Sequence, residues 1–304
     1  MNKSRAKQAT GRKRSRTRML AGLGASLGAI ILVGAALTFV FGHSMLNGYG
    51  KDKLETAFAE AHPGNTLRIG ELSYSMAANR LIAHSATLSG TSSTFKADWI
   101  SLTGVRWGRL LFGMAGLPEI LAQASLDATN LNVEFPQAQY GIRCERLRAS
   151  VRDSELIGEK IELRSLARDE AFFGADVFRT TLYHVVVPEC KVSGLAYREL
   201  LDGTSYRARS VHFSRPSFEA LVNLDKPSPP FLKSPPMIHE ALAAIRHPLR
   251  VDRLSITNGQ VSYCERMAVG ADPGVMTFSA INISAEGIAN RGGASAAIEL
   301  QGQC

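Results

Sequence analysis

Alternation of apolar and polar side chains with a period of two residues recurs along most of this chain and constrains its fold more than any other feature. The segments TLRIGELSYS (66–75) and RLIAHSATLSG (80–90) alternate over much of their length. This period is typical of β-strands with one apolar face, whereas an amphipathic helix repeats every 3.6 residues. We therefore predict a mainly β protein with an extended, mostly antiparallel sheet. The predicted strands cover residues 66–75, 80–90, 94–104, 126–135, 140–150, 156–167, 178–187, 205–214, 217–224, 274–288 and 293–304.

Helical spacing interrupts this alternation in short inserts. Residues 51–64, KDKLETAFAEAHPG, space their apolar side chains as a helix does and end at a Pro-Gly pair. The same spacing occurs in residues 105–123, 197–203 and 237–248. The inserts are too short to change the fold class, so the sequence predicts a sheet with a few short helices.

The segment LSITNGQVSY, residues 254–263, carries the strongest turn signal. An Asn-Gly pair, here Asn258 and Gly259, is the preferred loop of a two-residue β-hairpin, because both positions need a positive φ. A hairpin around this pair would place four apolar side chains on one face. That face either covers an ordinary core or contacts a bound lipid. The predicted lipid-facing residues are Leu254, Ile256, Val261 and Tyr263.

The net charge of +8 is located in one place. Residues 1–18 hold eight of the 35 basic residues and no acidic residue, which leaves 27 basic against 27 acidic residues in the rest. Residues 19–42 then contain no charged side chain. A helix of this length spans about 36 Å, enough for a hydrocarbon layer of about 30 Å. We predict a transmembrane anchor with the basic tail on the cytoplasmic side. A cleaved signal peptide is the alternative, but its apolar region would be shorter.

Proline marks a boundary further along the chain. Five of the twelve prolines lie in residues 226–236, which predicts an extended linker. The chain is thereby divided into a β-rich domain at 51–225 and a helix plus β-hairpin module at 237–304. The last strand pattern reaches the final residue without a polar cap, so we expect that the natural chain continues or that another chain covers this edge.

The sequence offers no arrangement of side chains that predicts catalysis, a cofactor or a metal. Cys144, Cys190, Cys264 and Cys304 lie too far apart for a metal motif, and both a disulfide and free buried thiols fit them. His239-Glu240 lacks the second histidine of a zincin. The acidic residues interleave with basic ones, as on a solvated strand face. These are Glu155, Glu159, Glu162, Asp169 and Glu170. We predict that the protein is not an enzyme.

The order of these segments resembles the AsmA-like proteins of bacterial envelopes, which are related to bridge-like lipid-transfer proteins. The residues that carry the resemblance are the anchor, TLRIGELSYSMAANRLIAHSATLSG, VRWGRLLFG and RVDRLSITNGQVSY. The resemblance implies an inner-membrane anchor and a periplasmic sheet bent into an open groove. It also implies a role in phospholipid transfer or outer-membrane maintenance, and it brings no catalytic residues.

Two functions follow from the sequence. The first is a single-pass inner-membrane protein whose periplasmic part handles phospholipid through an apolar β-groove and supports the outer membrane. The alternative is a non-enzymatic envelope scaffold or assembly factor that binds protein partners. Because the chain beyond the tail is neutral, nucleic acid is not a predicted partner.

Overall fold

The computed structural model describes residues 49–75, 78–106, 117–228, 245, 247–291 and 300–303. These residues form one long, mostly antiparallel sheet with a few short helices, which confirms the predicted mainly β class. The predicted tail, the anchor at 19–42 and most of the linker lie outside the described residues. Among the described residues, no helix has the length and apolar content needed to cross a membrane.

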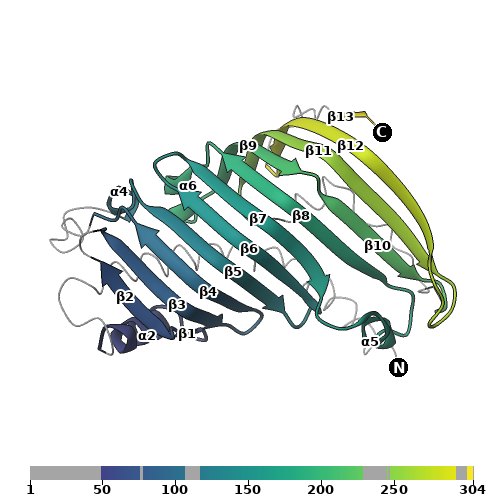
Figure 1. Cartoon of the computed structure of the whole chain (residues 1–304), viewed down its shortest axis with the longest axis horizontal. Coiled ribbons are helices and arrows are strands. Elements are labelled where there is room, and N and C mark those ends of the chain that lie inside the picture. Colours follow the sequence, from purple (N-terminus) through teal and green to yellow (C-terminus); the bar gives the residue numbers. More distant parts are fainter. Residues whose placement is uncertain are drawn as a thin grey trace, which may run out of the picture.

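The sheet has 13 strands (Figure 1). Their bounds follow the predicted alternation closely, with three exceptions: β8 continues through Pro188 to Ser193, the first predicted strand is divided in two, and β11 is one strand where a hairpin was predicted. The strands are β1 (Thr66–Arg68), β2 (Glu71–Ser75), β3 (Arg80–Ser89), β4 (Thr94–Thr103), β5 (Ser125–Phe135), β6 (Tyr140–Ser150), β7 (Glu155–Ser165), β8 (Thr181–Ser193), β9 (Tyr206–Ser214), β10 (Ser217–Asn223), β11 (Leu249–Arg266), β12 (Gly274–Ala289) and β13 (Leu300–Gln303).

Within the part of the chain that the structure describes, four short helices accompany the sheet. They are α2 (Tyr49–Ala61), α4 (Leu117–Ile120), α5 (Asp169–Gly174) and α6 (Tyr197–Leu201). Helix α2 lies beside β1 and β2 at one end of the sheet (Figure 1). Helix α5 corrects the prediction for Asp169 and Glu170, which lie in its first turn and not on a strand. The two acidic side chains suit that position because the first turn of a helix favours negative charge.

Strand order runs β1-β3-β4-β5-β6-β7-β8-β10-β11-β12-β13, and β2 also pairs with β3. Strands β9 and β10 follow one another at the same position in the sheet, since both lie antiparallel to β8 and parallel to β11. Arg215 and Pro216 separate them. Strands from both sides of the predicted linker at 226–236 therefore pair within the same sheet, and the domain boundary there stays a prediction.

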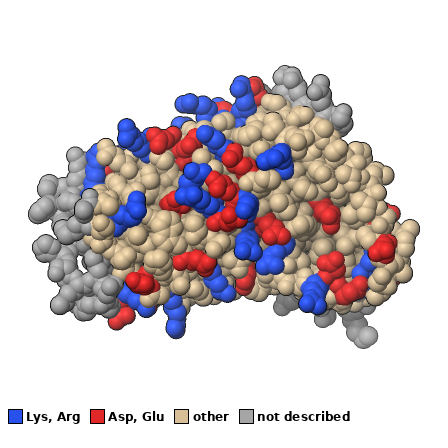
Figure 2. All heavy atoms as spheres, viewed as in Figure 1, with Lys and Arg blue, Asp and Glu red and all other residues tan. Residues whose placement is uncertain are grey.

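The two faces of the sheet differ in chemistry. One face carries a large buried cluster over β2 to β6, closed by Phe58 of α2 and by Ile120 and Leu121 at α4. We call this side the apolar face. The opposite, charged face carries Lys and Arg interspersed with Asp and Glu across its middle (Figure 2). This division is what the period of two in the sequence predicts.

A row of residues with positive φ crosses the sheet. The residues next to this row are paired across the strands: Thr129 lies opposite Arg146, which lies opposite Glu159. Where a strand crosses this row, successive side chains on its apolar face are three residues apart instead of two, as with the buried Ala128 and Leu131. Each strand therefore gains one residue there without losing its apolar face. The members of this row that have a positive φ are Ser85, Asn130, Lys160, Arg215, Asn258 and Ala280.

The predicted hairpin at Asn258-Gly259 is wrong. Residues 249–266 form the single strand β11, and the Asn-Gly pair lies at a register irregularity between Ile256 and Val261. Asn258 does have the positive φ that the pattern indicates, 54°. This conformation belongs to the extra residue of β11 in the row described above, and the strand continues beyond it. Pairing with β9, β10 and β12 provides hydrogen-bond partners for the backbone groups on both edges of β11. A local hairpin would provide partners on only one edge of each of its short strands. The observed hairpin joins β11 to β12 through residues 267–273.

Candidate functional site

The apolar face remains open where it continues over the C-terminal half of the sheet. Phe218, Tyr263, Met276 and Phe278 are 37%, 41%, 58% and 49% exposed. Register places them together, because Val261 lies opposite both Phe218 and Phe278, and Tyr263 lies opposite Met276. We call this surface the apolar strip. Its members are Tyr183, Phe218, Leu254, Ile256, Val261, Tyr263, Met276 and Phe278.

The four predicted lipid-facing residues all lie in the strip. Leu254 and Ile256 precede the irregularity in β11, while Val261 and Tyr263 follow it, and the extra residue keeps both pairs on the apolar face. Tyr263 is exposed and the other three are partly buried. The prediction that these four residues share one face is confirmed, although they share it within one strand and not across a hairpin. That these residues contact lipid stays a prediction.

Sequence reasoning missed the strip residues on neighbouring strands. Phe218 on β10 and Phe278 on β12 flank Val261 from either side. The ring centroids of Tyr183 and Phe218 are 5.8 Å apart, so aromatic contact links β8 to β10. The signal was present in the alternation of SFEALVN and GVMTFSA, but strand order cannot be obtained from alternation alone.

Polar atoms border the strip at the end nearest to α5. The Tyr263 hydroxyl donates a hydrogen bond to Glu265 Oε1 at 2.9 Å, and this bond to the carboxylate raises the pKa of Tyr263. The tyrosine therefore stays neutral at physiological pH. An apolar body with a hydrogen-bonded polar tip is typical of side chains at the boundary between apolar and aqueous surroundings.

A partly buried ionic cluster holds α5 across this end of the sheet. The Arg266 guanidinium donates to Glu170 Oε1 at 2.6 Å and to Asp225 Oδ1 at 3.2 Å. It also lies over the Phe173 ring, 4.7 Å from the centroid. Phe172 and Phe173 cover the charged face of the sheet at Leu182, Leu221 and Cys264. The cluster thereby ties the loop between β7 and β8 to the end of β11.

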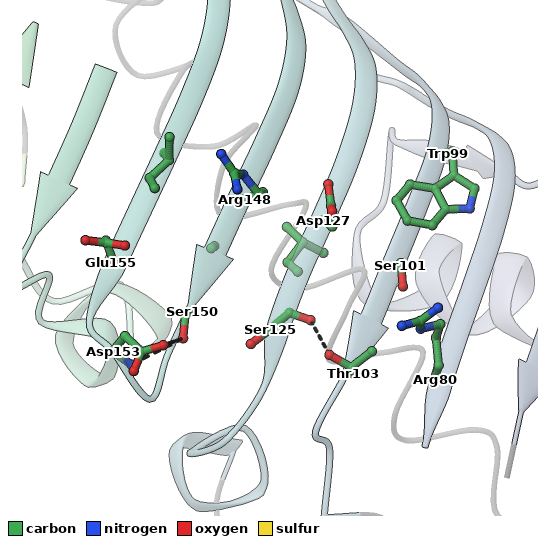
Figure 3. Close-up of a pocket in the computed structure, with 13 residues that line it drawn as sticks. Arg80, Trp99, Ser101, Thr103, Ser125, Asp127, Arg148, Ser150, Asp153 and Glu155 are labelled. Atoms are coloured by element: carbon green, nitrogen blue, oxygen red, sulfur yellow. Dashed lines mark hydrogen bonds between the residues drawn. The ribbon is translucent and has the colours of Figure 1, made fainter. Parts of the chain in front are cut away.

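The charged face bears a shallow hollow of about 510 Å³ (Figure 3). Small hydroxyl side chains on β4 to β6 form its floor, while Arg80, Trp99 and Arg148 rise at its border. Three of its five charged side chains form ion pairs: Arg148 binds Glu159, Lys191 binds Glu155, and Asp127 lies 2.6 Å from Arg146 Nη2. Arg80 and Asp153 also line the hollow, so it carries charges of both signs and does not define a site for an ion of one sign.

The described cysteines are suited to structure and not to chemistry. Cys144, Cys190 and Cys264 are buried and free, and Cys304 lies outside the described residues. Burial, followed by the neighbouring Cys144 and Glu189, raises the pKa of Cys190 to about 11. A protonated thiol is a poor nucleophile and metal ligand. The described part of the chain also contains no group of three or more His, Cys, Asp or Glu side chains placed to hold a metal ion.

Comparisons with known proteins leave the family open. No protein-family model matches the chain, and no curated protein matches its sequence. One solved structure with some similarity is LptH from Pseudomonas aeruginosa, described as the LptA-homologous periplasmic component of the lipopolysaccharide transport device. The TM-score is 0.23 at 4% identity, covering 42% of this chain and 75% of that chain. A TM-score this low establishes neither a shared fold nor a shared function.

Proposed function

We propose that the apolar strip binds the acyl chains of a membrane phospholipid, so that the protein handles or transfers lipid. The observation that carries the proposal is the exposure of Phe218, Tyr263, Met276 and Phe278 on one continuous face. Soluble surfaces rarely leave adjacent large apolar side chains open without a partner. The strip lies on the same face of the sheet as the buried cluster. A bound acyl chain would therefore lie on a face that is apolar from strand to strand.

The energetics favour an acyl chain as the occupant. Exposing an acyl chain to water costs about 0.8 kcal/mol per CH₂ group, so a chain of about 16 carbons faces a barrier on the order of 10 kcal/mol. Contact with the strip removes part of that cost. No directed polar groups are needed for such a chain, which agrees with a strip of aromatic and aliphatic side chains bordered by the Tyr263 and Glu265 pair.

Location follows the sequence in this proposal. Residues 19–42 anchor the chain in the bacterial inner membrane, the basic tail stays in the cytoplasm, and the sheet lies in the periplasm, where it supports the outer membrane. The AsmA-like pattern of the sequence supports this arrangement. The protein then acts by binding and not by catalysis.

Bound lipid measured on purified full-length protein tests the proposal. Phe278→Asp places a charge in the strip and is expected to lower co-purified phospholipid, measured by mass spectrometry, at least fivefold. Val275→Asp is the matched control, because Val275 is 60% exposed on the same strand but its side chain points to the charged face. Equal lipid content in the two variants would contradict the proposal.

One observation favours an envelope scaffold as a second function. Part of β12 has no neighbour on its outer side among the described residues. An open strand edge is a site where another polypeptide strand can add, as an envelope scaffold that binds a protein partner would require.

A further inference from the structure

Trp99 is an aromatic side chain on the charged face of the sheet. Within β4 the buried Ile100 lies on the apolar face, so its neighbours Trp99 and Ser101 point to the charged face. Both of them line the hollow on that face, and Figure 3 shows the indole beside it, close to Arg80. A single apolar side chain on a surface is common, so the importance of Trp99 depends on the groups that surround it.

The floor of the hollow contains a buried hydroxyl group without a partner. Ser101 is only 4% exposed, and its hydroxyl makes no hydrogen bond to any residue that the structure describes. Buried polar groups in folded proteins almost always have a hydrogen-bond partner. Because Ser101 lines the hollow, that partner can come from outside the chain. Ser262, which is 7% exposed on the same face, shows the ordinary case, since its hydroxyl lies 3.1 Å from the Thr277 hydroxyl.

Three more polar groups around the hollow have no hydrogen bond or ion pair within the described part of the chain. They are the Trp99 indole N–H, the Arg80 guanidinium and the Ser125 hydroxyl. Strand pairing brings the last two to neighbouring positions, because Thr103 lies between Arg80 on one side and Ser125 on the other. Indole and guanidinium N–H groups only donate, whereas a hydroxyl group both donates and accepts. A ligand with hydroxyl groups of its own can satisfy all of them.

The charges at the hollow cancel one another. Its lining side chains and their ion-pair partners comprise four basic and four acidic groups, so an ion of either sign gains no net attraction. Two hydrogen bonds from Arg146 also fix the Asp127 carboxylate, whose remaining lone pairs can accept from a ligand. This balance favours an uncharged ligand. The basic groups are Arg80, Arg146, Arg148 and Lys191, and the acidic groups are Asp127, Asp153, Glu155 and Glu159.

We propose that this hollow binds a neutral oligosaccharide. A sugar ring presents C–H groups on its faces and hydroxyl groups around its edge, which fits an indole beside several polar groups. The Trp99 ring stacks on a C–H face, while sugar hydroxyls form hydrogen bonds with Ser101, Ser125 and Arg80. The volume of about 510 Å³ lies within the range of small-ligand sites, about 300–1,000 Å³. The hollow lies on the opposite face from the apolar strip, so the proposal does not depend on lipid binding.

Isothermal titration calorimetry on detergent-solubilised full-length protein tests the proposal. The probes are chitotriose and maltotriose, which are neutral trisaccharides, and trigalacturonic acid, which is anionic. We expect saturable binding of at least one neutral probe and no tighter binding of the anionic probe. Trp99→Ala is expected to weaken the binding of the neutral probe about tenfold, because it removes the stacking contact. Binding of neither neutral probe, or tighter binding of trigalacturonic acid, would overturn the proposal.

A pair of serine variants separates sugar binding from stability. Ser101→Ala removes the unpartnered hydroxyl, so we expect about fivefold weaker binding with an unchanged melting temperature. Ser262→Ala is the matched control, because it breaks the contact with Thr277 and should lower the melting temperature without changing sugar binding. Trp99→Ala and Ser101→Ala are expected to keep the wild-type content of bound phospholipid. Sugar binding that survives both substitutions at the hollow would contradict the proposed site.

Discussion

The apolar face is closed over the N-terminal half of the sheet and open over the C-terminal half. Leu72 and Leu81 are each 1% exposed, whereas Met276 and Phe278 on the same face are 58% and 49% exposed. Phe58 of helix α2 and the residues Ile120 and Leu121 at α4 supply the cover in the first half. The difference shows that alternation builds an apolar face, while separate elements decide whether that face becomes a core or a binding surface.

The largest effect is expected from a pair of truncations on this one face. Leu81→Ala removes buried contacts and leaves a cavity, which costs about 2–5 kcal/mol of unfolding free energy. Met276→Ala removes a side chain that is mostly in water, so we expect less than about 1 kcal/mol. Urea denaturation of the two variants measures the comparison directly. Equal losses would mean that the two halves are equally packed.

Removal of the Arg266 guanidinium tests how the open half is held at its end. Arg266→Ala leaves Asp225, whose side chain is 11% exposed, without its partner and releases α5. A broken buried ion pair costs up to about 3 kcal/mol here, because Glu170 on the other side is largely solvated. Amide exchange is expected to rise most in residues 166–180. A uniform rise over the sheet would contradict a local role.

The pH dependence of stability examines Cys190, whose side chain lies on the apolar face between the two halves. Its folded-state pKa of about 11 exceeds the ordinary value of 9.0, so folding favours the protonated thiol. The resulting stability is complete below pH 9 and is lost as the pH rises through about 11, on the order of 2 kcal/mol. Denaturation at pH 8 and pH 11 should therefore show a steeper loss for the wild type than for Cys190→Ala. Parallel losses would contradict the burial of this thiol.

A smaller effect is expected where β11 crosses the row of positive φ. Asn258→Val forces a β-branched residue into φ of 54°, at a cost of about 1–2 kcal/mol. Asn258→Gly fits the same conformation and is expected to leave the melting temperature nearly unchanged. If Asn258→Val is as stable as Asn258→Gly, residue 258 does not have a positive φ in β11, which would contradict the account.

Much of the sheet could be predicted from the sequence because strand alternation is local. The predicted strand 140–150 has the observed bounds of β6, and 94–104 differs from β4 by one residue. Residues 254–263 show where local reasoning fails, since Asn258-Gly259 fits both a turn and an irregularity within a strand. The choice depends on whether β9, β10 and β12 are available as neighbours, which is a property of the whole sheet. Strand order, and with it the place of Phe218 beside Val261, depends on the same long-range pairing.

The most direct test of the strip is site-specific photo-crosslinking to lipid in native membranes. A photoreactive amino acid at position 254, 256, 261 or 263 is expected to crosslink phospholipid, with position 275 on the opposite face as the control. We predict lipid adducts at the four strip positions and none above background at position 275. Equal labelling on both faces, or none at the strip, would contradict the account.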